Sequence, residues 1–160
     1  MKIEMDLTFL LDMLREYSIV DQTQKDFICN KREYYLSLYE NTHKKTPFVT
    51  ELLLFICEKE SIPLEEEKLF KLIAARAGCD YMVIDPLKID SQLAVKTISP
   101  KYGVLNRVMP LYKEGNDIVL AMADPFRIDI IDQLSSTSGC NIIPVVSSSA
   151  DIDRVVSDIF

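Results

Sequence analysis

Residues 118–125 read Ile118-Val-Leu-Ala-Met-Ala-Asp-Pro, and this stretch decides how the C-terminal part of the chain folds. Six consecutive apolar residues without a glycine or proline predict a buried, central strand. Asp124 belongs to the residue types that cap helices, and Pro125 suits a first helical position, where a backbone N–H would have no partner. The stretch therefore predicts a strand followed directly by a helix, which continues to about Ser138 and ends at Gly139.

Two flanking segments complete a small sheet. Residues 107–112 and 141–146 are mostly apolar, and each contains one proline, which is tolerated at sheet edges. The turn Lys-Glu-Gly-Asn-Asp at 113–117 predicts that the first two strands are antiparallel. The intervening helix predicts that the second and third strands are parallel, with a right-handed crossover. A last helix, expected from Ser148 or Ser149, carries an apolar stripe: Ile152, Val155, Val156 and Ile159.

The N-terminal half repeats at a spacing of 43 residues, which places Leu10-Leu11 on Leu53-Leu54 and Ser18-Ile19 on Ser61-Ile62. Each copy predicts a helix, a tight turn and a second helix. In the first copy the second helix is expected from its cap at Asp21 to about Glu40, with Phe27, Tyr34 and Leu38 on one side. The second copy is expected to open at a Thr46-Pro47 cap and to end at Gly78. Two stacked hairpins would form a four-helix lobe.

The predicted fold class is therefore α+β. It comprises an N-terminal four-helix lobe of two helical hairpins over residues 1–79, a connector over 80–102, and a small α/β lobe over 103–160. The small lobe holds a three-stranded mixed sheet with packed helices. In the connector, Pro86 disfavours helix at Asp85, and residues 90–99 predict one or two helical turns.

Composition excludes several classes of function. The formal net charge is −7 and the pI about 4.7, so the basic footprint of a nucleic-acid-binding protein is absent. Neither Gly-x-x-x-x-Gly-Lys nor Gly-x-Gly-x-x-Gly occurs, which argues against a phosphate-binding loop and against enzymatic activity of this chain. The lone His43 has no catalytic partner nearby in sequence. No apolar run reaches the length of a membrane span, so no direct membrane insertion is expected.

No cofactor or metal site is expected either. The carboxylates of Asp124, Asp129 and Asp132 are explained by helix capping and by a solvated helix face, whereas a hard-cation site needs several converging oxygens. The cysteines are spaced too widely for a zinc site or a redox dithiol, so reduced thiols in a cytoplasmic protein are predicted: Cys29, Cys57, Cys79 and Cys140.

The order of segments from about Gly78 to Phe160 resembles the N-terminal domain of type II secretion and type IV pilus assembly ATPases. The resemblance is carried by the apolar run after Tyr81, by Asp85-Pro86, by Tyr102 and Val104 at the entry to the sheet, and by the stretch 118–125. It implies a non-catalytic regulatory and protein-interaction domain whose parent chain also carries an ATPase domain. It further implies docking to the cytoplasmic domain of an inner-membrane secretion platform protein. The expected location is cytoplasmic, peripheral to the inner membrane through that partner.

In many members of that family, tandem helical hairpins bind cyclic di-GMP through an Arg-Leu-Gly motif, a turn glycine and a distant Gln. This chain keeps the leucines Leu10 and Leu53 but departs from the motif elsewhere, so cyclic di-GMP is disfavoured as a ligand. The departures are Phe9 and Leu52 for Arg, Leu11 and Leu54 for the first Gly, Ser18 and Ser61 for the turn Gly, and Arg32 and Ala75 for Gln. Two alternatives stay open: a cyclic di-GMP sensor that binds by a diverged route, or the same domain fused to a membrane glycosyltransferase or a regulator.

The candidate partner-binding surface lies on the helical lobe. Three tyrosines surround its second helix more closely than one buried stripe requires, and tyrosine is enriched in interface cores. The candidate residues are Leu7, Leu10, Leu14, Tyr34, Tyr35 and Tyr39.

Overall fold

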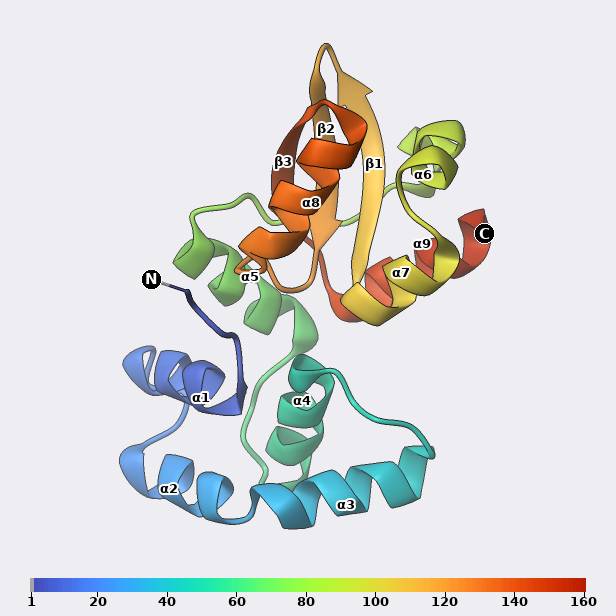
Figure 1. Ribbon diagram of the computed structural model, residues 1–160. Coiled ribbons are helices and arrows are strands. Elements are labelled where there is room, and N and C mark those ends of the chain that lie inside the picture. The colour runs from blue at the N-terminus through green and yellow to red at the C-terminus, as the bar shows by residue number, and fades with distance from the viewer. Residues whose placement is uncertain (1) are drawn as a thin grey trace. The chain divides into compact units, whose positions relative to one another are not determined.

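The computed structural model describes residues 2–160, and the chain divides between Glu66 and Glu67 into two compact units (Figure 1). We call the first the helical unit and the second the sheet unit, and each is described by itself. Across the described residues the α+β class is confirmed. The contacts group the fifth helix with the sheet, and the three-part division at residues 79 and 102 stays a prediction.

The helical unit contains α1 (Leu7–Glu16), α2 (Gln22–Asn30), α3 (Arg32–His43) and α4 (Val49–Lys59). Helix α1 begins where the Asp6 carboxylate accepts the Phe9 N–H at 2.8 Å. Helix α2 begins at a capping box, in which Asp21 and Gln24 each accept the other's backbone N–H. Asp21 therefore caps the next helix, as predicted.

One predicted helix is two helices in the structure. Lys31 (φ −103°, ψ 11°) interrupts the segment expected to run unbroken from Asp21 to Glu40. The break allows α2 to pack against α1 while α3 packs against α4. The predicted Thr46-Pro47 cap is also wrong, because Phe48 is still extended and α4 begins at Val49.

The turns after α1 and α4 have the same backbone structure, which supports the 43-residue repeat. Ser18 (φ 61°) and Ser61 (φ 55°) both adopt the left-handed conformation that usually favours glycine. The Ile19 N–H donates to the Leu14 carbonyl at 2.9 Å, and the Ile62 N–H donates to the Cys57 carbonyl at 2.8 Å. With the matching bonds from the two serine N–H groups, each turn is a Schellman motif, the usual C-terminal helix cap. Both turns therefore adopt a conformation that usually favours glycine with serine in its place.

The sheet unit holds the remaining elements, and its strand order β1-β2-β3 confirms the predicted mixed sheet. Strands β1 and β2 are antiparallel, and β2 and β3 are parallel. The elements are α5 (Glu66–Ala77), the 3-10 helix η1 (Pro86–Lys88), α6 (Ser91–Thr97), α7 (Pro100–Asn106), β1 (Val108–Glu114), β2 (Asp117–Met122), α8 (Ile128–Ser138), β3 (Asn141–Val146) and α9 (Ser149–Ile159).

One helix boundary in this unit differs from the prediction, and one helix was not predicted. Helix α8 begins at Ile128 instead of Pro125, because the Asp124 carboxylate accepts the nearby Phe126 N–H at 3.0 Å and so closes a turn before the helix. Helix α7 was not predicted, since Tyr102 and Val104 were interpreted as the entry to the sheet. Its start nevertheless has a typical signal, a Ser99 cap that accepts the Tyr102 N–H, followed by proline.

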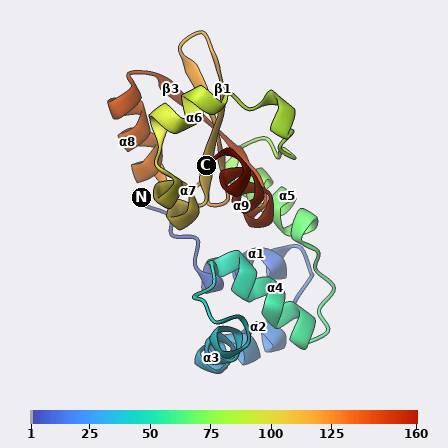
Figure 2. The same cartoon turned by 90° about the vertical axis from the view of Figure 1, so that its right-hand side faces the viewer.

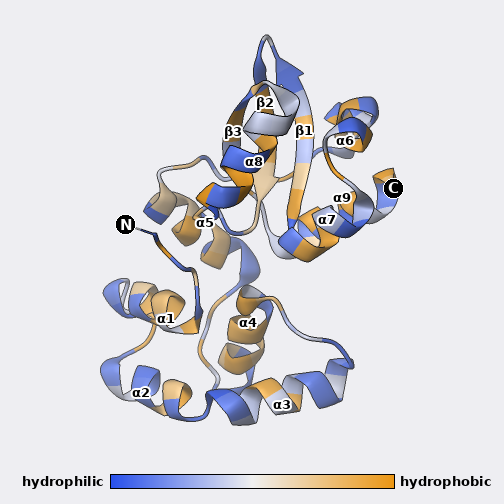
Figure 3. Cartoon of the chain, viewed as in Figure 1, coloured by the Kyte–Doolittle hydropathy of each residue, from blue (hydrophilic) through white to orange (hydrophobic). Residues whose placement is uncertain are grey.

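The sheet is covered on both faces. One face carries the core cluster in which Ile118, Leu120 and Met122 of β2 pack with Ile130 and Leu134 of α8. Helix α9 contacts β1 and β2 from the other side, and Figure 2 shows α8 and α9 on opposite sides of the strands. This coverage explains why β2 is apolar from Ile118 to Met122 (Figure 3).

Residues 80–90 run from one edge of the sheet to the other. Tyr81 pairs with Val146 at the outer edge of β3, and the Asp90 N–H donates to the Leu111 carbonyl of β1 at 2.7 Å. Between these points the Ile84 N–H donates to the Asp151 carboxylate of α9 at 2.8 Å. The connector therefore protects part of both sheet edges.

None of the helices formed by residues 2–160 combines the length and apolar character needed to cross a bilayer.

Candidate functional site

The three leucines predicted to face a partner are core residues. Leu7 is 4% exposed, and Leu10 and Leu14 are 0% exposed. They lie on the inward stripe of α1, which contacts α2 and α4. This placement corrects the prediction: an amphipathic stripe at helical spacing is buried within the unit itself and does not form its surface.

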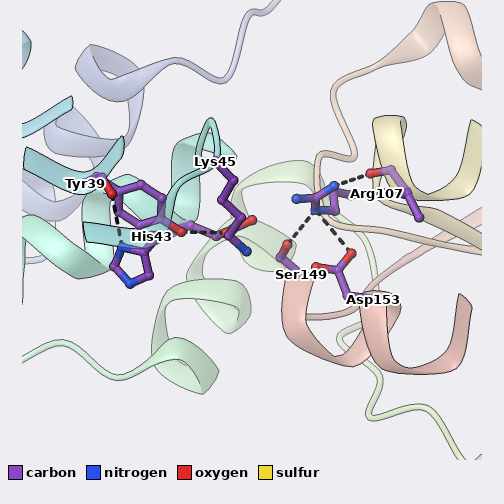
Figure 4. A network of polar contacts seen from close by, with 8 residues as sticks. Tyr39, His43, Lys45, Arg107, Ser149 and Asp153 are labelled. Atoms are coloured by element: carbon purple, nitrogen blue, oxygen red, sulfur yellow. Dashed lines mark hydrogen bonds and ion pairs between the residues drawn. The ribbon is translucent and has the colours of Figure 1, made fainter. Parts of the chain in front are cut away.

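Two of the three tyrosines are also buried. Tyr35 and Tyr39 are 6% and 5% exposed. The Tyr39 hydroxyl donates to the Glu51 carboxylate at 3.0 Å, and its ring stacks on His43 with centroids 4.1 Å apart. Figure 4 shows Tyr39 and His43 beside Lys45, which forms an ion pair with Glu51 at 3.6 Å. These contacts hold α3 against α4, so Tyr35 and Tyr39 are structural.

Tyr34 alone among the six candidates presents its side chain to solvent, with 54% exposed. The buried line of α2 and α3 runs through Ile28, Tyr35 and Tyr39, whereas the prediction grouped Phe27 and Tyr34 with Leu38 on one side of a single helix. The three buried residues lie one position after the grouped ones and keep the same helical spacing, so the inward face is displaced by one residue. Phe27 is likewise exposed, at 45%.

The exposed aromatic residues form one surface at the junction of α2 and α3. The Lys31 ammonium lies 5.8 Å from the Phe27 ring centroid and 5.6 Å from that of Tyr34. These distances fit cation–π contacts of the lysine with both rings. We call Phe27, Lys31 and Tyr34 the elbow surface.

A groove of about 240 Å³ adjoins the elbow surface. It is mostly apolar and is lined by Thr23, Gln24, Phe27, Ile28, Glu60 and Ile62. Phe27 belongs to both features, so an exposed ring and a hollow are continuous there. Exposed aromatics next to a groove are typical of protein-interaction surfaces.

A second hollow lies at the first turn. It measures about 330 Å³ and includes Arg15, Ser18, Asp21 and Gln24. The Arg15 guanidinium donates to the Gln22 side chain at 2.8 Å. The corresponding residue at the second turn is Glu58, so the Arg15 guanidinium has no counterpart at that position.

The described residues contain no cluster of three or more potential metal ligands. All four cysteines are free thiols, and burial raises the pKa of Cys57 to about 11, which keeps it protonated and unreactive. Asp129 is held by two hydrogen bonds from Arg127, which lower its pKa to about 2.

Arg107 organises one corner of the sheet unit. Its Nε donates to Ser149 Oγ at 3.1 Å and lies 3.4 Å from a carboxylate oxygen of Asp153 (Figure 4). Its backbone is left-handed (φ 52°) and ends α7. Arg107 therefore ties the start of β1 to α9, which is a structural role.

Comparison with known proteins identifies the family. The model of the MshEN domain matches residues 77–160, and the chain therefore belongs to the MshEN domain family. Type IV pilus assembly ATPase PilB of Myxococcus xanthus (strain DK1622) is 25% identical over 93 residues, which are 58% of this chain and 16% of PilB. The chain thus spans less than a fifth of the length of that relative.

Solved structures share the fold. A structure of MshE with cdg has a TM-score of 0.61 at 19% identity, covering 94% of this chain and 98% of that one. The N-terminal domain of XpsE matches in two crystal forms, with TM-scores of 0.50 and 0.59 at 15% and 14% identity. These alignments cover 98% and 97% of this chain, and 98% and 96% of the XpsE chains. The chain is accordingly similar to the N-terminal domains of secretion and pilus-assembly ATPases.

Proposed function

We propose that this chain is the non-catalytic N-terminal interaction domain of a type II secretion or pilus-assembly ATPase. It docks its parent motor on the cytoplasmic domain of an inner-membrane platform protein, and is cytoplasmic and peripheral to the membrane through that partner. The observation that supports docking most is the elbow surface, where Phe27 and Tyr34 are about half exposed beside an apolar groove. Large aromatic residues often carry most of an interface's binding energy.

Titration calorimetry against the cytoplasmic domain of the platform protein from the same bacterium tests this proposal. The double variant Phe27→Ala/Tyr34→Ala should weaken binding by about tenfold or more, because a truncated aromatic anchor typically costs about 2 kcal/mol. Tyr17→Ala is the matched control, since Tyr17 is 48% exposed in the same unit but lies outside the elbow surface. If Tyr17→Ala weakens binding as much as the double variant does, the elbow surface is not the contact surface. If the unmodified chain does not bind the platform domain, the docking proposal is rejected.

The isolated chain should hydrolyse no ATP, because it has no phosphate loop in its sequence. Turnover that survives a second purification step would contradict this proposal. Sequencing the parent gene distinguishes an ATPase parent from the alternative parents. A nucleotide-binding loop downstream supports the ATPase, whereas a glycosyltransferase core would support the glycosyltransferase parent.

Cyclic di-GMP sensing is the second candidate, and one observation favours it. Arg15 lies in the hollow at the first turn, where it could supply a charged donor from a position other than the family's Arg. MshE, the structural relative solved with cdg, shows why the ligand is worth testing. We nevertheless expect a Kd no tighter than roughly 100 μM, since Phe9 and Leu52 offer no charged donors. A low-micromolar isotherm that Arg15→Ala abolishes and Arg32→Ala preserves would establish the sensor instead.

A further inference from the structure

A third hollow, in the sheet unit, contains two lysines without acidic partners. It measures about 250 Å³ and includes Lys96 of α6, Lys113 of β1 and Ser138 of α8. Among residues 2–160 the structure gives neither ammonium group an ion pair or a hydrogen bond. Both side chains are exposed, so the hollow holds two solvent-accessible cationic groups. We call this feature the lysine hollow.

The sheet directs Lys113 into this hollow. Lys113 is the register partner of Ile118, whose side chain belongs to the core cluster beneath α8. Glu114, the next residue along β1, points to the opposite face because side chains alternate along a strand. The nearby Asp117 carboxylate is occupied by the Asn141 amide at 2.9 Å. Asp117 is the register partner of Glu114 and lies on that opposite face as well, so both nearby acids point away from the hollow.

A favourable interaction with a helix dipole accounts for the position of Lys96 but not for that of Lys113. Lys96 lies in the last turn of α6, where a cation interacts favourably with the helix C-terminus. Lys113 lies on a strand, where no such field acts. A second cation at the same hollow raises the electrostatic potential there and favours a bound anion.

The hydroxyl groups add a second recognition element. Thr97 and Thr137 line the hollow and donate their protons to the helix carbonyls of Leu93 and Gln133 at 2.7 and 3.1 Å, so their oxygens can act there only as acceptors. Ser138 Oγ accepts the Cys140 N–H at 3.2 Å, which leaves its own proton available to donate. The hollow thus offers cationic donors, one hydroxyl donor and two acceptors.

We propose that the lysine hollow binds a small phosphate monoester that carries hydroxyl groups. The two ammonium groups neutralise the phosphate dianion, and the threonine oxygens accept from the ligand's hydroxyl groups. The volume lies below the roughly 300–1,000 Å³ of sites for drug-sized ligands, which indicates a ligand of a few carbons. This site is separate from the elbow surface and does not depend on the docking proposal.

Amide shifts in an NMR titration with glycerol 2-phosphate test the site, at an ionic strength of about 0.15 M so that generic surface charge is screened. Saturable shifts should occur at Lys96, Lys113 and Ser138, and inorganic phosphate should bind at the same place more weakly. The variant Lys96→Gln/Lys113→Gln should weaken binding by at least about tenfold. Lys88→Gln/Lys101→Gln, which removes the same charge from exposed positions elsewhere in the unit, should leave it unchanged.

Thr137→Val separates hydroxyl recognition from simple charge attraction. It keeps the side-chain shape but removes the acceptor, so it should weaken glycerol 2-phosphate and leave inorganic phosphate unaffected. Cosedimentation with phosphatidylcholine vesicles that contain phosphatidic acid distinguishes a membrane-borne monoester from a free one. The proposal is overturned if no shift saturates, if the Lys88/Lys101 control weakens binding equally, or if Thr137→Val affects both probes alike.

Discussion

The turns after α1 and α4 have the same backbone and different chemistry. Ser18 and Ser61 share the left-handed conformation, and both turns close with the same Schellman hydrogen bonds. Their flanking side chains differ, however: Arg15 precedes the first turn, and Glu58 stands at the equivalent position before the second. The two turns therefore share a backbone although their flanking side chains differ, because the turn is required by the helical hairpin itself.

The largest expected difference between the turns is the loss of stability on replacing Leu14 or Cys57, the residues whose carbonyls close the two Schellman motifs. Leu14 and Cys57 are both 0% exposed. Leu14→Ala should lower the free energy of unfolding by about 2–5 kcal/mol, since it leaves a cavity in the core. Cys57→Ala removes only one heavy atom and should cost about 1 kcal/mol. Urea unfolding followed by far-UV circular dichroism measures both, and equal losses would show that the two positions are packed alike.

A smaller difference appears on raising the pH. Burial raises the pKa of Cys57 from 9.0 to about 11, so the unfolded thiol ionises before the folded one does. This stabilising contribution is complete below pH 9 and is lost as the pH rises towards 11. At pH 10 the loss should be about 1.4 kcal/mol. Urea unfolding of the native chain and of Cys57→Ala at pH 8 and pH 10 isolates this effect. If both proteins lose the same unfolding free energy between the two pH values, Cys57 makes no such contribution.

The smallest effect concerns the serines. Ser18→Gly and Ser61→Gly should each stabilise the chain by about 0.5–1 kcal/mol, because glycine adopts a positive φ without steric cost. Ser37→Gly, within α3, should instead destabilise it by up to about 1 kcal/mol. Thermal unfolding of the three variants provides the test. A clear inequality between the two turn variants would mean that the matching hydrogen bonds conceal unequal strain.

The prediction from sequence succeeded where a local sequence pattern is compatible with only one local structure. Proline in the two outer strands and none in the Ile118 strand predicted the strand order, and the repeat predicted both turns. It failed where tertiary packing chose between options. Asp124 could cap a helix or close a turn, and it closes the turn.

The candidate site was harder to predict than the fold. A buried line of leucines and tyrosines looks the same in sequence whether it contacts a partner or the protein's own helices. The sequence grouped Phe27 and Tyr34 on one side of a helix, but only the structure shows that this side faces solvent and that the neighbouring Ile28 and Tyr35 face inward. The lysine hollow was beyond sequence reasoning, because it brings together residues from α6, β1 and α8.

The connector that spans the sheet has a consequence for the order of folding. Its bonds from Ile84 to Asp151 and from Ser147 to Met82 join residues 67 and 65 positions apart. Closing such long loops costs more entropy than forming neighbouring hairpins, and contacts of this kind form slowly. On the ribosome, residues 80–84 have no anchor until the last strand and helix have emerged. The helical unit closes through contacts within its own 66 residues and can mature while the connector is still unattached.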